Sequence, residues 1–119
     1  MKYKFRAWNK KYKFMMEPDL LDLVNYRVKY DSDWYEQDEF ILEQCIGFDK
    51  YNNEVYEGDI FELPDRYLVV QRYDSNQQIG FRVLKLKTNV TSNYMFSGFT
   101  INDITELCRL GNIHETVID

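Results

Sequence analysis

The sequence contains few of the residues that build chemical centres. Its 119 residues include one histidine, two cysteines, two prolines and five glycines. A single histidine with no cysteine or carboxylate at ligand spacing is a poor basis for a metal site. There is also no glycine-rich phosphate loop, zinc cluster or nucleophile elbow. We therefore expect no metal, no cofactor and no enzymatic activity.

Long apolar runs are missing as well. The N-terminal residues alternate between polar and apolar and contain no apolar segment typical of a signal peptide. No run is long enough to cross a bilayer. We therefore expect a cytoplasmic protein without a membrane partner. Cys45 and Cys108 each lie in an apolar strand-like pattern, which predicts buried free thiols in a reducing compartment, although spacing alone leaves a disulfide open.

Aromatic residues are abundant, and acidic residues exceed basic ones. Ten tyrosines and eight phenylalanines favour strands over helices. The length predicts one domain. The net charge of -5 argues against a general phosphate-binding surface. Local basic character is confined to the first thirteen residues, at Lys2, Lys4, Arg6, Lys10, Lys11 and Lys13.

The most informative stretch is Gln44 to Phe61. Asn52-Asn53 predicts a hairpin turn, because asparagine tolerates the left-handed conformation. Gly58 predicts a sharp bend with positive φ, flanked by Glu57 and Asp59, which we expect to point at water. On a regular strand the side chains of residues 57 and 59 would point to the same side and could form a catalytic carboxylate pair, but the bend at Gly58 breaks this alternation. A turn-stabilising role is favoured, with Asp59 accepting backbone N–H bonds and with Tyr56 and Ile60 as core anchors.

The rest of the chain reads mainly as short strands. Residues 1–16 alternate as a hairpin with aromatic side chains on one face, lysine and arginine on the other, and Trp8 packed over the core. Residues 20–24 have helical spacing and could be a short helix or a loop. Residues 31–39 read as an acidic loop, 74–78 and 88–97 as polar loops, and 40–48, 67–73, 79–87 and 103–110 as strands. About seven short antiparallel strands predict a small mainly-β barrel or roll.

Three motifs together resemble the YopX family of phage and prophage proteins. They are FRAWNKKYKFM near the start, QCIGFDKYNNEVYEGDIF in the middle and LGNIHE near the end. The sequence departs from the family pattern at Asn9, Ile46 and Asn53. The positions that match are Phe5, Arg6, Trp8, Gly47, Asp49, Tyr56, Glu57, Gly58, Asp59, Ile60, Gly111, Asn112, Ile113 and Glu115.

The resemblance implies an SH3-like roll or barrel, a phage origin within a bacterial host, and a homo-oligomer. It carries no catalytic residue. We expect one YopX-like domain over residues 1–119, made of a hairpin (1–16), a variable acidic insert (17–39) and a barrel core (40–115).

The first functional hypothesis is a non-enzymatic phage accessory protein that binds a host protein of a defence or regulatory pathway. The candidate contact residues are Trp34, Tyr35, Asp31 and Asp33, because aromatic side chains in an exposed acidic loop suit a binding surface. The alternative is that both aromatics fold back and cap the core. Self-association would use the strand from Ile79 to Leu86, whose two faces are both partly apolar.

Two other hypotheses remain. Nucleic acid could bind the basic hairpin at Lys4, Arg6 and Lys11, although the alternation places the aromatics on the opposite face. An oligomer could also sequester a small nucleotide signal at its subunit junctions. A nucleophilic pair of Cys108 and His114 would need both side chains in a cleft, and the strand pattern around Cys108 argues against it.

Overall fold

The computed structural model describes residues 4–73, 78–87, 101–116 and 118. Within them the protein is mainly β, as predicted, with eleven strands and two short 3-10 helices. The expected loops at 74–77 and 88–97 lie outside the described residues. The SH3-like form and the single domain stay predictions, whereas the folded chain divides into two compact units, Met1–Cys45 and Ile46–Asp119.

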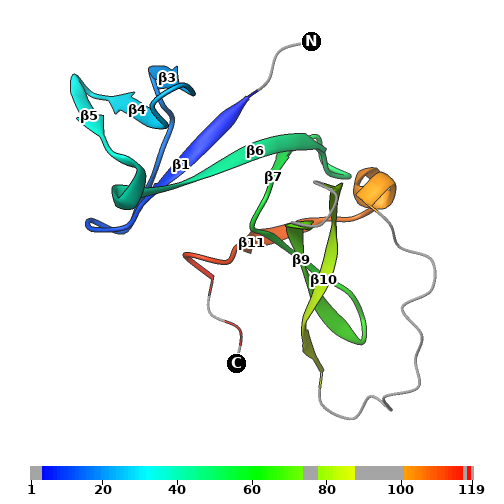
Figure 1. Cartoon of the computed structure of the whole chain (residues 1–119). Coiled ribbons are helices and arrows are strands. Elements are labelled where there is room, and N and C mark those ends of the chain that lie inside the picture. Colours follow the sequence, from blue (N-terminus) through cyan, green and yellow to red (C-terminus); the bar gives the residue numbers. More distant parts are fainter. Residues whose placement is uncertain (1–3, 74–77, 88–100, 117, 119) are drawn as a thin grey trace. The chain divides into compact units, whose positions relative to one another are not determined.

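Figure 1 shows the elements along the chain. In chain order they are β1 (Phe5–Asn9), β2 (Phe14–Met16), β3 (Leu20–Asp22), β4 (Arg27–Tyr30), β5 (Asp33–Tyr35), the 3-10 helix η1 (Gln37–Glu39), β6 (Phe40–Phe48), β7 (Glu54–Tyr56), β8 (Asp59–Glu62), β9 (Arg66–Tyr73), β10 (Gln78–Leu86), the 3-10 helix η2 (Ile101–Glu106) and β11 (Arg109–Asn112).

The strands form three sheets, ordered β2-β1-β6-β7, β10-β9-β8-β11 and β3-β4-β5. The first unit contains the predicted N-terminal hairpin, in which β1 and β2 are antiparallel. Trp8 is buried, as expected. The predicted basic outer face is wrong for Arg6, which is buried. Because β1 is a central strand between β2 and β6, Arg6 meets Glu43 directly opposite on β6 and forms an ion pair with it.

The segment 17–39 contains three strands and, at its end, η1, in place of the helix or loop expected at 20–24 and the loop expected at 31–39. It forms the three-stranded sheet β3-β4-β5, whose strands lie side by side in Figure 1. Leu21 of β3, Tyr30 of β4 and Tyr35 of β5 pack against the core cluster Ala7, Met16, Val28 and Phe40. These long-range apolar contacts favour strands over the local helical spacing of Leu20 to Val24. The extra strands explain why the observed number exceeds the expected seven.

The second unit is built around the sheet β10-β9-β8-β11 and the core cluster Val55, Phe61, Val70 and Ile104. The predicted strand over 103–110 is wrong at its start, where η2 occupies Ile101–Glu106. Ile104 and Leu107 both pack at this cluster, and a separation of three residues is one turn of a 3-10 helix. Among the described strands β10 pairs only with β9, so it is an edge strand rather than a central one.

Candidate binding surface

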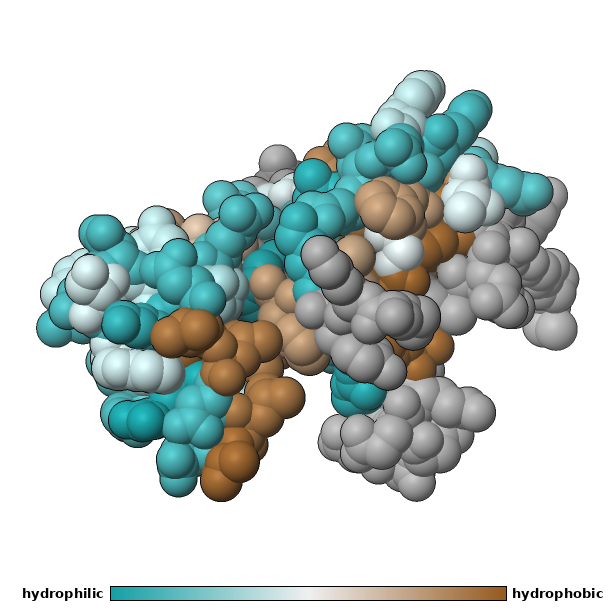
Figure 2. Space-filling view, turned by 90° about the horizontal axis from the view of Figure 1, so that it is seen from above, coloured by the Kyte–Doolittle hydropathy of each residue, from teal (hydrophilic) through white to brown (hydrophobic). Residues whose placement is uncertain are grey.

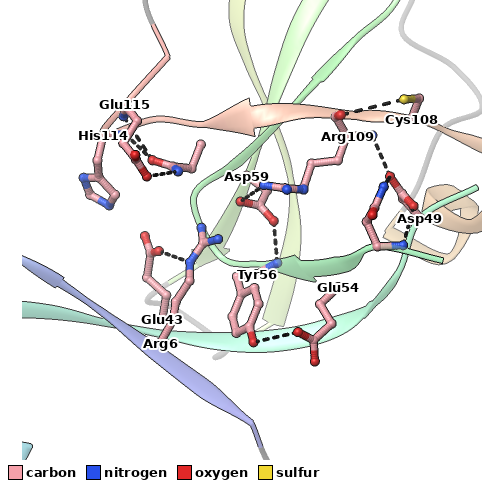
Figure 3. A network of polar contacts seen from close by, with 12 residues as sticks. Arg6, Glu43, Asp49, Glu54, Tyr56, Asp59, Cys108, Arg109, His114 and Glu115 are labelled. Carbon is pink, nitrogen blue, oxygen red and sulfur yellow. Dashed lines mark hydrogen bonds and ion pairs between the residues drawn. The ribbon is translucent and has the colours of Figure 1, made fainter. Parts of the chain in front are cut away.

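The predicted bend at Gly58 is a tight turn between β7 and β8. Gly58 has a φ of +88°, as expected. Asp59 is fully buried, so the expectation that it faces water is wrong. One of its oxygens accepts the Tyr56 N–H at 2.7 Å, which is the turn-stabilising role predicted for it, and the other lies 3.6 Å from Arg109 Nη1 (Figure 3). Tyr56 and Ile60 are both buried, as predicted.

Glu57 and Asp59 do not act as a pair. Glu57 is bound by Arg72, with Nη2 3.0 Å from Oε1, whereas Asp59 lies beside Arg109. Each carboxylate therefore has its own cationic partner. This arrangement stabilises the turn and differs from two carboxylates that converge on one reacting atom.

Asp49 organises the hairpin between β6 and β7. Its Oδ1 accepts the N–H groups of Tyr51 and Asn53 at 2.9 and 2.8 Å, and Asn52 takes the predicted left-handed conformation with a φ of +64°. Its Oδ2 accepts the Arg109 N–H at 3.0 Å. Burial opposes ionisation of Asp49, but the hydrogen bonds from Arg109, Asn53 and Tyr51 outweigh it and lower its pKa.

The motif near the C-terminus closes against the Gly58 turn. Asn112 faces Asp59 in the β11–β8 pairing, and the Ile113 N–H donates to the Gly58 carbonyl at 2.8 Å. The Asn112 side chain accepts the N–H groups of His114 and Glu115 and donates to Glu115 Oε1 (Figure 3). These hydrogen bonds join the motif in the middle of the chain to the motif near its end.

The remaining chemical candidates are dispersed. Cys45 and Cys108 are not joined by a disulfide, and neither is fully buried as expected. Cys45 is half-buried, and Cys108 is exposed because it lies between η2 and β11 instead of within a strand. The described residues contain no group of three histidine, cysteine or acidic side chains that could hold a metal. None of the helices in that part of the chain is long and apolar enough to span a membrane.

The nucleic-acid candidates do not form one basic face. Lys4 and Lys11 are exposed, and Lys11 Nζ lies 5.1 Å from the centroid of the Tyr12 ring. Arg6 is buried, and its Nε donates to Glu43 Oε1 at 2.8 Å. Since its charge is paired inside the protein, Arg6 is not part of an exposed phosphate-binding surface.

The partner-binding candidates lie on β5 and in the turn before it. Trp34 is 40% exposed, and it stands opposite Lys29, which stands opposite Leu20. Residues opposite one another in antiparallel strands share a face of the sheet. Leu20, Lys29 and Trp34 therefore form one row on the outer face of β3-β4-β5. Tyr35 belongs to the other face and packs at the core, so the two aromatics predicted to act together are separated.

Two cations lie over the Trp34 ring. The Arg27 guanidinium carbon is 4.6 Å from its centroid, and Lys29 Nζ is 6.0 Å away. Asp31 and Asp33 are exposed at the β4–β5 turn, where Asp31 and Ser32 have positive φ. We call the row of Leu20, Lys29 and Trp34, together with Asp22 and Arg27, the Trp34 face. Arg27 and Lys29 were not among the predicted site residues, although their alternation with Val28 is a strand signal.

Comparison with known proteins identifies a family. The family model described as YopX protein matches residues 4–117, nearly the whole chain. No curated protein matches the sequence. The extent of the family match means that this chain belongs to the YopX family.

Proposed function

We propose that this protein is a non-enzymatic phage accessory protein that binds a host protein through the Trp34 face. The observation that carries the proposal is the exposed Trp34 ring on the outer face of β3-β4-β5, with Arg27 and Lys29 over it. Tryptophan and arginine are the residue types that most often dominate binding energy in protein interfaces.

The Trp34 face is fixed before a partner arrives. The opposite face of its sheet packs on the core through Leu21, Val28 and Tyr35. On the outer face, Arg27 is held by Asp22, with Nη2 3.1 Å from Oδ2, while it lies over the Trp34 ring. An ordered surface loses less conformational entropy on binding, so more of its contact energy contributes to affinity.

Charge favours a protein partner over nucleic acid. Between residues 19 and 39 the only basic residues are Arg27 and Lys29, whereas seven residues are acidic: Asp19, Asp22, Asp31, Asp33, Glu36, Asp38 and Glu39. A nucleic acid carries a phosphate on every nucleotide, so this excess of negative charge would repel it. A protein surface can instead place one acidic side chain near Arg27 and Lys29 and basic side chains around it.

The test compares two exposed aromatics that each lie near a lysine. Trp34→Ala removes the proposed contact, and Tyr51→Ala is the matched control, because Tyr51 is 65% exposed and Lys50 Nζ is 5.9 Å from its ring centroid. Host proteins retained by each variant in infected cells are quantified by mass spectrometry. Tyr35 is left intact because it packs at the core.

We expect at least one host protein to be retained by the wild type and Tyr51→Ala but lost by Trp34→Ala. The purified pair should show an affinity lowered by roughly 10- to 100-fold for Trp34→Ala. If Trp34→Ala retains every protein that Tyr51→Ala retains, the Trp34 face is not the contact surface.

A further inference from the structure

The turn between β3 and β4 exposes two large aliphatic side chains. Val24 is 92% exposed and Leu23 is 62% exposed, and Leu20 at the start of β3 is 55% exposed. Figure 2 shows apolar side chains gathered in a brown patch on the side where Figure 1 places β3 and β4. Single exposed aliphatics are common on protein surfaces, but three within five residues mark an interaction site. We call Leu23 and Val24 the apex.

The polar groups of this turn are satisfied within the turn itself. Asp22 Oδ1 accepts the N–H groups of Val24 and Asn25 at 3.2 and 3.1 Å, and its Oδ2 accepts Asn25 Nδ2 at 2.9 Å. The hydrogen bonds from Asn25, followed by the one from Arg27, lower the pKa of Asp22 to about 2, so the carboxylate is ionised throughout the physiological range.

The turn is also anchored from below. Tyr26 has a φ of +54°, which is rare for a bulky residue and persists only where the surroundings hold it. Its ring stacks on the buried Phe40, with centroids 5.6 Å apart and an interplanar angle of 11°. These contacts hold the backbone of the turn, and the side chains of Leu23 and Val24 are left exposed.

We propose that the partner of this protein has an apolar pocket that receives Leu23 and Val24. This inference rests on the proposed function and adds the chemistry of the partner. Arg27 faces Asp22 at the base of the turn, and Lys29 lies two residues further along β4, roughly 7 Å away at the usual rise of a strand. The partner surface then joins an apolar pocket to an acidic side chain that meets Arg27 and Lys29.

A host protein fits this surface better than a membrane or a second copy. An anionic bilayer is repelled by the acidic side chains between residues 19 and 39, which outnumber the two basic ones. A second copy would bring the same acidic excess against itself. Both of these occupants are distinguishable in the experiment below.

The first arm identifies what touches the apex. A photo-activatable aliphatic residue replaces Val24 in infected cells, and the control places it at Ile41, which is 41% exposed in the same unit. We expect crosslinks from position 24, but not from position 41, to apolar residues of the host protein whose retention depends on Trp34. Crosslinks from position 24 to another copy of this chain, or to phospholipid, would overturn the proposal.

The second arm measures affinity with that purified host protein. Val24→Asp and Val24→Ser should weaken binding by at least roughly tenfold, because they place a charge or a hydroxyl in an apolar pocket, whereas Val24→Leu should stay within about twofold. At 92% exposure residue 24 has little part in folding, and circular dichroism checks that each variant is folded. Binding unchanged by Val24→Asp but lost with Trp34→Ala overturns the pocket alone. If no host protein depends on Trp34, the proposed function falls, and the pocket falls with it.

Discussion

Two tight turns in this protein are each held by an aspartate that accepts backbone N–H bonds, and they serve different ends. At the Gly58 turn, Asp59 is fully buried, and the turn itself is bound on two sides: the Gly58 N–H donates to Val70 and the Gly58 carbonyl accepts from Ile113. At the β3–β4 turn, Asp22 satisfies the backbone locally, and the side chains of Leu23 and Val24 remain exposed.

The Gly58 turn stabilises the fold, whereas the β3–β4 turn carries side chains that we propose for recognition. Every polar group of the Gly58 turn described above has a partner within the chain, so the motif that identifies the family stabilises the second unit. The β3–β4 turn also has its backbone hydrogen-bonded, yet Leu23 and Val24 contribute almost nothing to the core. Exposed aliphatics on an ordered turn lower the solubility of a protein unless a partner covers them. The binding surface that we propose lies in the segment that carries none of the family motifs.

Among the turn residues, the largest effect on stability is expected at Asp59. Asp59→Ala leaves the Tyr56 N–H without its acceptor and Arg109 without its nearest carboxylate, so the free energy of unfolding should fall by about 3 kcal/mol. Urea unfolding measures this change. The matched control is Asp33→Ala in the exposed β4–β5 turn, which should cost less than about 0.5 kcal/mol. If the two variants lose equal amounts of unfolding free energy, the Gly58 turn does not have the structural role assigned to it.

Asp49 makes the second unit sensitive to acid. Its folded-state pKa is lower than the ordinary value of 3.8, so its contribution to stability is complete above that value and is lost as the pH falls through the folded-state pKa. Asp49→Asn should therefore cost about 1–2 kcal/mol at pH 7 and progressively less below pH 4. Unfolding curves between pH 7 and pH 2.5 test this. A difference between wild type and variant that does not shrink in acid would show that ionisation of Asp49 is not what stabilises the hairpin.

Gly111 offers a more local change. A Cβ atom at this position would collide with the side-chain oxygen of Thr116. Gly111→Ala should lower the free energy of unfolding by about 1–3 kcal/mol, the usual cost of overpacking. Thr116→Ala removes the colliding oxygen, so the double variant should recover part of the loss. If the double variant instead loses as much stability as the two single variants together, the glycine is needed for a reason other than contact with Thr116.

Local chemistry in the sequence was enough to predict the turns of the second unit. Asn52 and Gly58 both adopt the positive φ expected of them, and Asp59 accepts the expected backbone N–H. The burial of Asp59 was not predictable, because Arg109 and Asn112 reach it from fifty residues away in β11. Likewise Arg6 looked exposed by alternation, and only its pairing with Glu43, 37 positions later, brings it inside.

The candidate surface was predictable only in part. Trp34 was identified from its acidic surroundings, but the cations over its ring come from β4, and the spacing of Leu20 to Val24 suggested a helix. The hydrophobic spacing of residues 20–24 contains no information on the hydrogen bonds that Asp22 accepts in the turn or on the stacking of Tyr26 on Phe40. The first contact is local to the turn and the second joins distant segments, and together they determine which apolar residues stay outside.

The smallest effect on stability is expected at Trp34, and the chain provides its own comparison. It contains two tryptophans, of which Trp8 is 6% exposed in β1 and Trp34 is 40% exposed in β5. Trp34→Ala should lower the free energy of unfolding by no more than about 1 kcal/mol, mainly through lost contact with Arg27 and Lys29. Trp8→Ala should cost about 3–5 kcal/mol because it empties a buried site. Thermal unfolding of the two variants measures both. If both variants lose a comparable amount of unfolding free energy, Trp34 acts as a core residue. A small loss at Trp34 agrees with a role in binding instead of folding.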